Sequence, residues 1–531
     1  MTASISEFIG TQPILALFLA IGLGYAVGQV RFLDFSLGVG AVLFVGLFIG
    51  AIAPKVQIAG PLGLVGLIMF LYAIGILYGR QFFEGLSGPG RIYNLLAAVA
   101  VIAGLLVALG LGAIFQVRLG HTLGIFAGSM VSTAALQAAI DTIGNRDPSI
   151  GYSVTYPFGV IGPILCLYFM TRRVKPVFPP KPARFHLGEV TVERLPVAGA
   201  TLGAVMATLP DGVQIAGVRQ EHRNRLPDPE LELHPGDALL IAADRAVAVD
   251  EVASALGHID RGRLANDRGD LTYQRFFVSK PALTSVRLAE LPMPPDVPIR
   301  ILHVRRYDMD LMPSPDLMLE MGDRVGVLVA PDQVAAARAH FGDTVKAAAE
   351  FSYVSVGLGM VLGVLLGLMP IPVPGVGTVT LGIGGGPLIV ALILGRLRRT
   401  GPLSWVMPLP ANIVLRNLGL TLFLATVGIN SGQAFVTTVA ETGPLMLLIG
   451  VAVLLTTVAI VLLAGFYLLG IPFDDLLGVA SGATGNPAIL AYSARTAPTE
   501  RPDVCYAMIF PSMTIVKVFS VQIIGLLSLA G

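Results

Sequence analysis

The stretch GVASGATGNPAILAY, residues 478–492, lies between apolar segments near the end of the chain and is rich in Gly, Thr, Asn and Pro. It is too short and too polar for an ordinary membrane-spanning helix. A similar stretch, GIFAGSMVSTAALQA at residues 124–138, lies about 354 residues upstream. The matched positions are Gly124 and Gly478, Gly128 and Gly482, Ala134 and Ala488, and Leu136 and Leu490. This pair predicts that the chain is built from two related halves.

The composition of the 531-residue chain is that of a membrane protein: 54% of the residues are hydrophobic, 13% are charged, and the mean hydropathy is +0.77. The net charge of +1 and the lack of a basic stripe argue against nucleic acid as a partner. Cys166 and Cys505 lie in apolar runs, so we expect buried thiols rather than a disulfide or a metal site. The sequence has no P-loop and no metal-ligand spacing among its histidines, so we expect neither an enzyme nor a cofactor.

Apolar runs long enough to cross a bilayer fall into two groups. They lie at about 13–30, 37–53, 62–79, 92–116 and 150–171, and again at about 352–369, 379–397, 412–432, 444–469 and 504–528. The start of the chain has no basic residue and lacks a cleavage motif, so the first run is predicted to be a retained span. Residues 172–350 are rich in Pro, Asp, Arg and His, which predicts a soluble insert.

The two groups of spans resemble each other in sequence. GLIMFLYAIGILYG at residues 66–79 aligns without gaps on GLTLFLATVGINSG at residues 419–432. Several such matches in the same order predict a duplication. Tyr152 and Pro157 likewise match Tyr506 and Pro511.

The charges of the short loops predict the topology. If each polar stretch enters the membrane and returns, one face collects Arg31, Arg80, Arg91, Arg172, Arg173, Lys175, Arg396, Arg398, Arg399, Arg495 and Arg501, and the other collects Lys55, Arg118 and Arg146. We therefore expect a polytopic α-helical membrane protein with two inverted repeats, each of five spans plus one re-entrant hairpin. The α+β insert would be cytoplasmic and both termini would lie outside.

The insert contains a smaller repeat. LHPGDALLIAA at residues 233–243 and LEMGDRVGVLVA at residues 319–330 each place a Gly-Asp turn before a β-rich apolar run, and a short helical segment follows each, at 246–256 and at 333–341. The predicted boundaries are a membrane repeat at 1–171, a Pro-rich linker at 172–184, lobes at 185–258 and 269–346, and a second membrane repeat at 351–531.

The two predicted hairpins are the candidate substrate site. Irregular backbone is tolerated inside a membrane only where protein buries it or where it lines a watery cavity, and exposed amides at helix N-termini favour a carboxylate. The candidate residues are Gly128, Ser129, Ser132, Thr133, Gln137, Gly482, Thr484, Gly485, Asn486 and Pro487. The alternative is that these small residues only let helices pack closely.

Two cations complete the candidate site. Lys517 falls near the middle of the last span, where an ionisable residue indicates function, although a structural bond to helix carbonyls would also explain it. Arg416 opens the third span of the second half, and extension of its side chain to the cytoplasmic interface is the alternative there.

The duplicated membrane half with GLTLFLATVGINSG and SGATGNPAILAY, split by paired lobes around Asp237 and Asp323, resembles the aspartate:alanine exchanger family of bacterial secondary transporters. The lobes are similar to the C-terminal regulatory domains of potassium-transport proteins. The resemblance implies exchange of small carboxylates, by aspartate/alanine exchangers in some members and exporters of succinate or related dicarboxylates in others. The first stretch departs from the family pattern: Met130 and Thr133 stand where the second has Thr484 and Pro487.

We therefore expect an antiporter of small carboxylates in the bacterial inner membrane, working by alternating access around the two hairpins. Its expected partners are these substrates, the lipid bilayer and a second copy in a homodimer. A dicarboxylate exporter is the alternative within this class. An ion channel gated by the lobes is the alternative from another class, but the sequence shows no carbonyl-filter motif.

Overall fold

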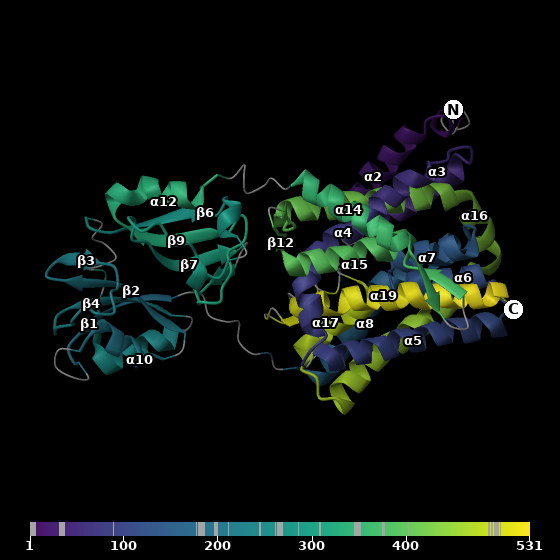
Figure 1. Cartoon of the computed structure of the whole chain (residues 1–531). Helices are drawn as coiled ribbons and strands as arrows, with labels where there is room; N and C mark the ends of the chain where they lie inside the picture. Colours follow the sequence, from purple (N-terminus) through teal and green to yellow (C-terminus); the bar gives the residue numbers. More distant parts are fainter. Residues whose placement is uncertain are drawn as a thin grey trace. The chain divides into compact units, whose positions relative to one another are not determined.

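The computed structural model divides the chain into two compact units (Figure 1): unit 1 holds residues 1–179 and 352–531, and unit 2 holds residues 180–351. The residues described are 7–30, 38–88, 90–176, 178, 186–195, 200–210, 212–243, 246–260, 262, 269–284, 286–306, 309–344, 352–373, 377–401, 403–486, 489, 492, 497, 499 and 501–530.

Unit 1 is helical. Its first part holds α2 (Pro13–Gln29), η1 (Gly38–Gly40), α3 (Ala41–Ile52), α4 (Gly60–Gly85), α5 (Gly90–Ile114), α6 (Leu119–Ser129), α7 (Thr133–Ile143) and α8 (Asp147–Val174). Its second part holds α14 (Tyr353–Leu368), β10 (Pro370–Val373), β11 (Gly377–Thr380), α15 (Gly382–Leu397), β12 (Arg399–Thr400), β13 (Leu403–Ser404), α16 (Leu409–Ala459), η5 (Ile460–Leu468), α17 (Phe473–Thr484) and α19 (Arg501–Ala530). The η5 segment is a π-helical continuation of α16.

The helices match the spans predicted from the apolar runs. Among the described residues, six helical stretches are long and apolar enough to cross a membrane, and four shorter apolar helices accompany them. Both parts of unit 1 have the same order, two shorter helices followed by three long ones. The shorter ones are α2, residues 38–52, α14 and α15, and α16 with η5 supplies two of the long stretches. Unit 1 is therefore the membrane part of a multi-pass protein.

The two parts of unit 1 interleave through glycines. A methyl group at Gly66 of α4 would lie 2.6 Å from the carbonyl oxygen of Gly419 in α16, and one at Gly419 would lie 2.5 Å from that of Gly66. Further along, Gly79 of α4 packs on the backbone of α15, and Gly428 of α16 packs on the backbone of α3. Small residues of this kind let membrane helices approach closely. Each part therefore supplies a helix that packs into the other.

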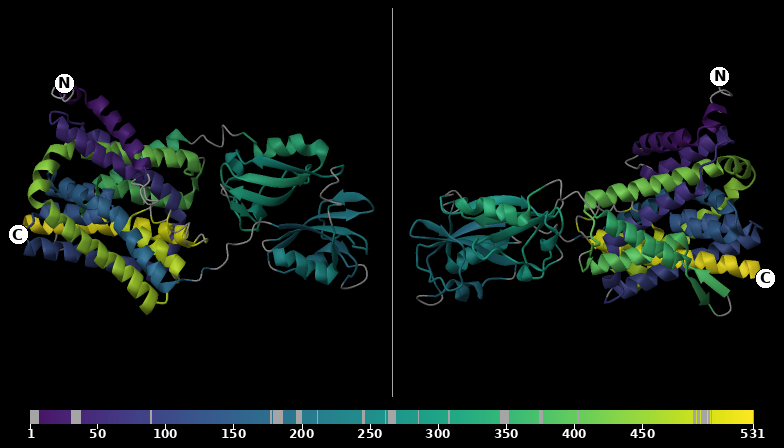
Figure 2. Two further views of the ribbon diagram at one scale, coloured as in Figure 1. Left: turned by 180° about the vertical axis from the view of Figure 1, so that it is seen from behind. Right: turned by 45° about the horizontal axis from the view of Figure 1, so that its top comes forward.

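The helices α8 and α19 run in opposite directions through unit 1. Thr142, shortly before α8 begins, packs on Gly525 near the end of α19. At the other end, Thr171 of α8 lies 3.4 Å from the phenol oxygen of Tyr492, which precedes α19. Figures 1 and 2 show α17 and the C-terminus at opposite ends of the unit. The short helices packed on them, α6 on α8 and α17 on α19, begin at opposite ends as well.

Unit 2 consists of two sheet-containing lobes. The first holds β1 (His186–Val192), α9 (Leu202–Met206), β2 (Val213–Gln220), β3 (Arg223–Arg225), β4 (Ala238–Ala243), α10 (Ala246–Leu256) and β5 (Gly257–Asp260), with antiparallel strand order β3-β2-β4-β1-β5. The second holds β6 (Thr272–Phe277), η2 (Pro281–Leu283), η3 (Leu288–Glu290), β7 (Arg300–Arg306), β8 (Met309–Leu311), β9 (Arg324–Val329), η4 (Pro331–Gln333) and α12 (Val334–Phe341), with antiparallel order β6-β9-β7-β8.

The Gly-Asp turns close both lobes in the same way. Asp237 Oδ2 accepts a hydrogen bond from the backbone N–H of His234 at 2.8 Å, and Asp323 Oδ2 accepts one from Glu320 at the same distance. The register of the sheet also shifts at equivalent places, at 215/217 and at 301/303. An aspartate that satisfies its own turn explains why these positions precede a buried strand.

Candidate functional site

The first polar stretch contains a helix break at residues 130–132. Val131 has a left-handed backbone with φ +47°, which is strained for a β-branched residue. The backbone N–H of Val131 donates to Gly128 O at 3.0 Å, and that of Ser132 donates to Ala127 O at 2.8 Å. Ser132 then caps α7, because its Oγ accepts from the N–H of Ala135 at 3.3 Å. The break thus ends α6 and starts α7 without leaving these amides unpaired.

The second polar stretch breaks after Thr484 with the same bonding pattern. Gly485 takes the left-handed conformation with φ +76°. Its N–H donates to Gly482 O at 3.2 Å, and the N–H of Asn486 donates to Ser481 O at 3.0 Å. Val131 and Gly485 are about 354 residues apart, the spacing that relates the two stretches in sequence.

The side chain of Asn486 ties the second break to α8. Its Nδ2 donates to Val160 O at 2.8 Å and to Gly159 O at 3.3 Å. Gly159 lies four residues before Pro163, and proline has no N–H to donate to that carbonyl. Pro163 therefore frees one of the two acceptors that Asn486 uses, the carbonyl of Gly159.

The two breaks meet at Lys517. The Nζ of Lys517 donates to Met130 O at 3.3 Å, and a Cβ atom at Gly485 would lie 3.5 Å from Nζ and 3.0 Å from Met130 O. Lys517 is only 1% exposed. A buried ammonium is costly without a counter-charge, which makes this meeting point the natural place for an anion.

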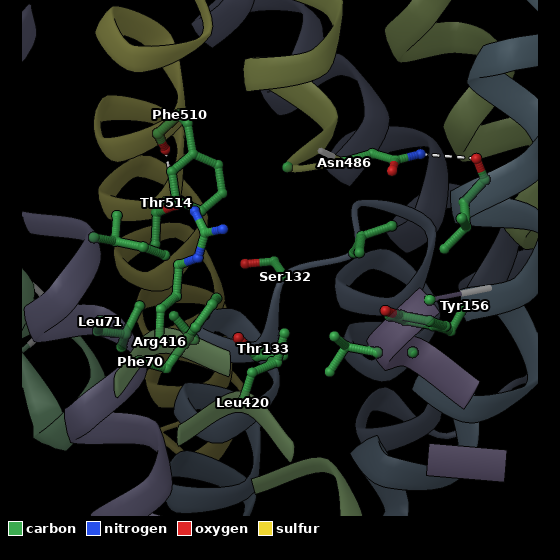
Figure 3. Close-up of a pocket in the computed structure, with 18 of the residues that line it drawn as sticks. Phe70, Leu71, Ser132, Thr133, Tyr156, Arg416, Leu420, Asn486, Phe510 and Thr514 are labelled. Atoms are coloured by element: carbon green, nitrogen blue, oxygen red, sulfur yellow. Dashed lines mark hydrogen bonds between the residues drawn. The ribbon is translucent and has the colours of Figure 1, made fainter. Parts of the chain in front are cut away.

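A cavity of about 370 Å³ opens beside this meeting point (Figure 3). Its described lining residues are Gly38, Val39, Gly40, Phe70, Leu71, Ile74, Val131, Ser132, Thr133, Ala134, Tyr156, Val160, Arg416, Asn417, Leu420, Gly485, Asn486, Tyr506, Phe510, Thr514 and Lys517. Figure 3 shows the guanidinium of Arg416 beside Phe510 and Thr514, with Ser132 and Thr133 across from it. The volume is in the range of small-molecule pockets.

The charge of the cavity is positive. Arg416 and Lys517 line it, and none of its described lining residues is Asp or Glu. Within the described part of the chain neither cation forms an ion pair, although the phenol of Tyr78 is a polar neighbour of Arg416. The described residues of the whole chain contain no group of three or more His, Cys, Asp or Glu able to hold a metal. Such a cavity can bind an anion through charge-assisted hydrogen bonds.

The predicted site residues divide into two sets. Those that line the cavity are Ser132, Thr133, Gly485, Asn486, Arg416 and Lys517. The others support the helices: Gly128 packs on Tyr152 and Thr155, Ser129 Oγ donates to Gly450 O, Gln137 Nε2 donates to Asp141, Gly482 packs on Ile509, and Thr484 Oγ1 donates to Ala480 O. Pro487 lies outside the described residues.

Several lining residues were missed by sequence reasoning. Tyr156 of α8, its sequence equivalent Phe510 in α19, and Tyr506 contribute aromatic surface. Thr514 and Asn417 contribute polar groups. A signal existed, because YSVTYPFG at residues 152–159 matches YAMIFPSM at residues 506–513 at the spacing of the two polar stretches. An aromatic residue before proline in both copies pointed to the long helices as part of the site.

Comparison with known proteins gives a consistent result. A family model described as "Predicted Permease Membrane Region" of the aspartate:alanine exchangers matches residues 16–171 and 355–526, and a TrkA-C domain model matches residues 277–342. Proteins named as uncharacterised transporters are similar over nearly their full length. That of Geobacter sulfurreducens is 37% identical, covering 97% of this chain and 98% of the relative, and that of Corynebacterium efficiens is 35% identical, covering 98% and 99%. The chain is therefore a member of the aspartate:alanine exchanger family of membrane transporters, with a TrkA-C domain in its insert.

Proposed function

We propose that this transporter exchanges small dicarboxylates across the bacterial inner membrane. The observation that carries the proposal is the cavity between the two helix breaks, where Arg416 and Lys517 face a space without a carboxylate among its described lining residues. A dianion such as succinate can pair with both cations and accept hydrogen bonds from the hydroxyls of Ser132 and Thr133.

The charge of the cavity also predicts the order in which it should bind the substrates of the family. Aspartate carries two carboxylates and can engage both cations, but its ammonium group meets no carboxylate among the described lining residues. Alanine engages a single cation and has the same unpaired ammonium. An unpaired buried charge is costly, so we expect dicarboxylates to bind more tightly than aspartate, and aspartate more tightly than alanine.

Alternating access is supported by the matching packing of the two parts of unit 1. A methyl group at Gly124 would overlap the carbonyl of Pro148, and one at Gly478 would overlap that of Pro502. Both contacts join a short helix to the start of the long helix after it, α6 to α8 and α17 to α19. Since α8 and α19 run in opposite directions, these elements fit two inverted repeats with one re-entrant hairpin each, which can open the cavity to either face in turn.

The proposed orientation rests on the loop charges, which put the insert in the cytoplasm and both termini outside. Assembly as a homodimer is proposed from the family resemblance. Thiol labelling from outside would test the orientation, because a Lys55→Cys variant should react and a cysteine in the insert should not.

The experiment is counterflow in proteoliposomes containing the purified full-length protein. Labelled succinate should enter rapidly when succinate is inside and slowly into empty vesicles. Lys517→Met should raise the half-saturating succinate concentration at least tenfold, because losing a charge-assisted hydrogen bond costs about 1.5–3 kcal/mol.

Lys55→Met is the matched control, since the Lys55 side chain is 78% exposed and lies outside the cavity lining; it should change transport less than twofold. Lys517→Met with an unchanged concentration dependence would contradict the site. Ion currents without counter-substrate would favour a channel instead.

A further inference from the structure

Two charged pairs occupy equivalent positions at the starts of the short helices. His121 of α6 faces Asp147, the first residue of α8, and Asp475 of α17 faces Arg501, the first residue of α19. His121 and Asp475, and likewise Asp147 and Arg501, are about 354 residues apart. The acidic and basic partners have therefore exchanged places between the two halves.

The two pairs lie at opposite faces of the membrane part. Tyr93, near the start of α5, donates to Asp475 Oδ2 at 2.7 Å. Gly112, near the end of α5, packs on Thr122 beside His121, where a methyl group would lie 2.6 Å from Oγ1. Nineteen residues of helix separate Tyr93 from Gly112, which is about 28 Å, close to the thickness of a hydrocarbon core. Each face thus has one pair joining a short helix to a long one.

The pairs differ in strength. Arg501 binds Asp475 with both arms of its guanidinium, Nε to Oδ1 at 2.7 Å and Nη2 to Oδ2 at 2.5 Å. His121 Nε2 is 3.8 Å from Asp147 Oδ1, too far for a hydrogen bond, and has no hydrogen-bond partner among the described residues. His121 is nevertheless only 7% exposed. The Asp475–Arg501 pair carries permanent charges, whereas the attraction between His121 and Asp147 depends on whether the imidazole is protonated.

We propose that His121 and Asp147 form a proton-dependent latch that controls opening on the face opposite the Asp475–Arg501 pair. Protonated His121 donates from Nε2 to Asp147 and holds the start of α6 on α8, which disfavours opening there. The charged groups that act on His121 are Asp147 of α8 and Arg118, which precedes α6; among the described residues, the other helices packed on α6 bring no ionisable side chain to it. The latch rests on the alternating access proposed above, in which His121 and Asp147 are positioning residues.

The test varies the pH of one compartment at a time in the counterflow assay. Acidifying the outer compartment from pH 8 to pH 5.5 should slow exchange at least threefold, while the same change on the insert side should not. His121→Gln and Asp147→Asn should remove this response, and His121→Lys should be slow at both pH values. Arg501→Lys should keep the response, because it leaves the His121 pair intact. A His121→Gln protein with the wild-type response would overturn the latch.

A second measurement separates the latch from the substrate assignment. In a background without Cys166 and Cys505, Leu420→Cys places a thiol in the cavity lining. Acid slows the labelling of any thiol because the thiolate is the nucleophile, so the rates are divided by those of an exposed Lys55→Cys thiol. A membrane-impermeant thiol reagent added outside, without substrate, should give a lower relative rate at pH 5.5 than at pH 8, and His121→Gln should abolish this difference. This result would stand even if succinate is not transported, whereas an equal relative rate at both pH values would overturn the latch alone.

Discussion

At the scale of single residues, the site depends on two left-handed positions. Val131 bears the strain of that conformation, and Gly485 adopts it without a Cβ penalty. Lys517 reaches between them to Met130 O, a residue 387 positions away. The strain at Val131 is tolerated because the amides around the break are bonded and the neighbouring helices hold it.

Gly485→Ala should destabilise the protein by about 1–2 kcal/mol, since the left-handed conformation costs this much for a residue with a Cβ atom. The added methyl group would also lie 3.0 Å from Met130 O, close to Lys517, so succinate exchange should fall. Thermal unfolding in detergent and counterflow measure the two effects. Gly110→Ala is the control: Gly110 lies within α5 with open space around it, so that change should be neutral or slightly stabilising. Equal stability of the two variants would contradict the strain expected for an alanine in the left-handed conformation at position 485.

At the scale of elements, the two parts of unit 1 are held together where glycines let the backbones of crossing helices touch. Gly66 and Gly419 meet at the crossing of α4 and α16, each facing the carbonyl of the other. Pro163 acts at the same scale, because the carbonyl it frees in α8 accepts one of the two hydrogen bonds by which Asn486 holds the second break. These contacts join segments far apart in sequence, so the site is assembled by packing between the two parts.

Gly419→Ala should therefore weaken the crossing by about 1–3 kcal/mol, the usual cost of overpacking a close contact. The methyl group would meet backbone atoms of α4, which cannot rotate away. The detergent-solubilised protein is heated, and size-exclusion chromatography measures the fraction that remains monodisperse. The midpoint temperature of this loss should be lower for the variant than for the wild type. Gly22→Ala in α2, with nothing within 4 Å, is the control and should leave the midpoint unchanged. A Gly419→Ala midpoint equal to the control would show that the helices can separate freely here.

At the scale of the whole molecule, the two units have separate apolar cores. Each lobe of unit 2 has a main apolar core of its own. A further cluster includes Leu240 of β4, Leu302 of β7 and Leu328 of β9, so the lobes pack through their sheets. The single Trp of the chain, Trp405, lies in unit 1. Its fluorescence therefore reports on unit 1 alone.

Leu302→Asp should lower the stability of unit 2 by about 3–5 kcal/mol, because it places an unpaired charge in the contact between the lobes. The transition seen in the β-sheet signal of circular dichroism should move to lower temperature, and the Trp405 fluorescence transition should stay in place. Leu187→Asp is the control, since Leu187 is 52% exposed. A parallel shift of the Trp405 signal would show that the two units unfold together.

Local sequence was sufficient for the class of protein, the order of the spans, the two polar stretches and the Gly-Asp turns. Hydropathy over a bilayer thickness and the preferences of Gly, Asp and Pro act within a few residues, so their effects are readable in a linear sequence. The helical segment predicted at residues 246–256 is found as α10 with the same bounds. Ser132, Thr133, Gly485 and Asn486 were identifiable because they lie at the breaks themselves.

Which side chains share the cavity was decided only by the tertiary structure. Tyr156 and Tyr506 line it because α8 and α19 pack beside the breaks, while the equally polar Ser129 and Gln137 turn to Gly450 and Asp141. The direction of a side chain depends on how a helix is rotated against partners hundreds of residues away, and no local pattern contains that rotation. The stretch at residues 478–492 thus marked where the helix breaks, and packing against α8 and Lys517 determined what the break contacts.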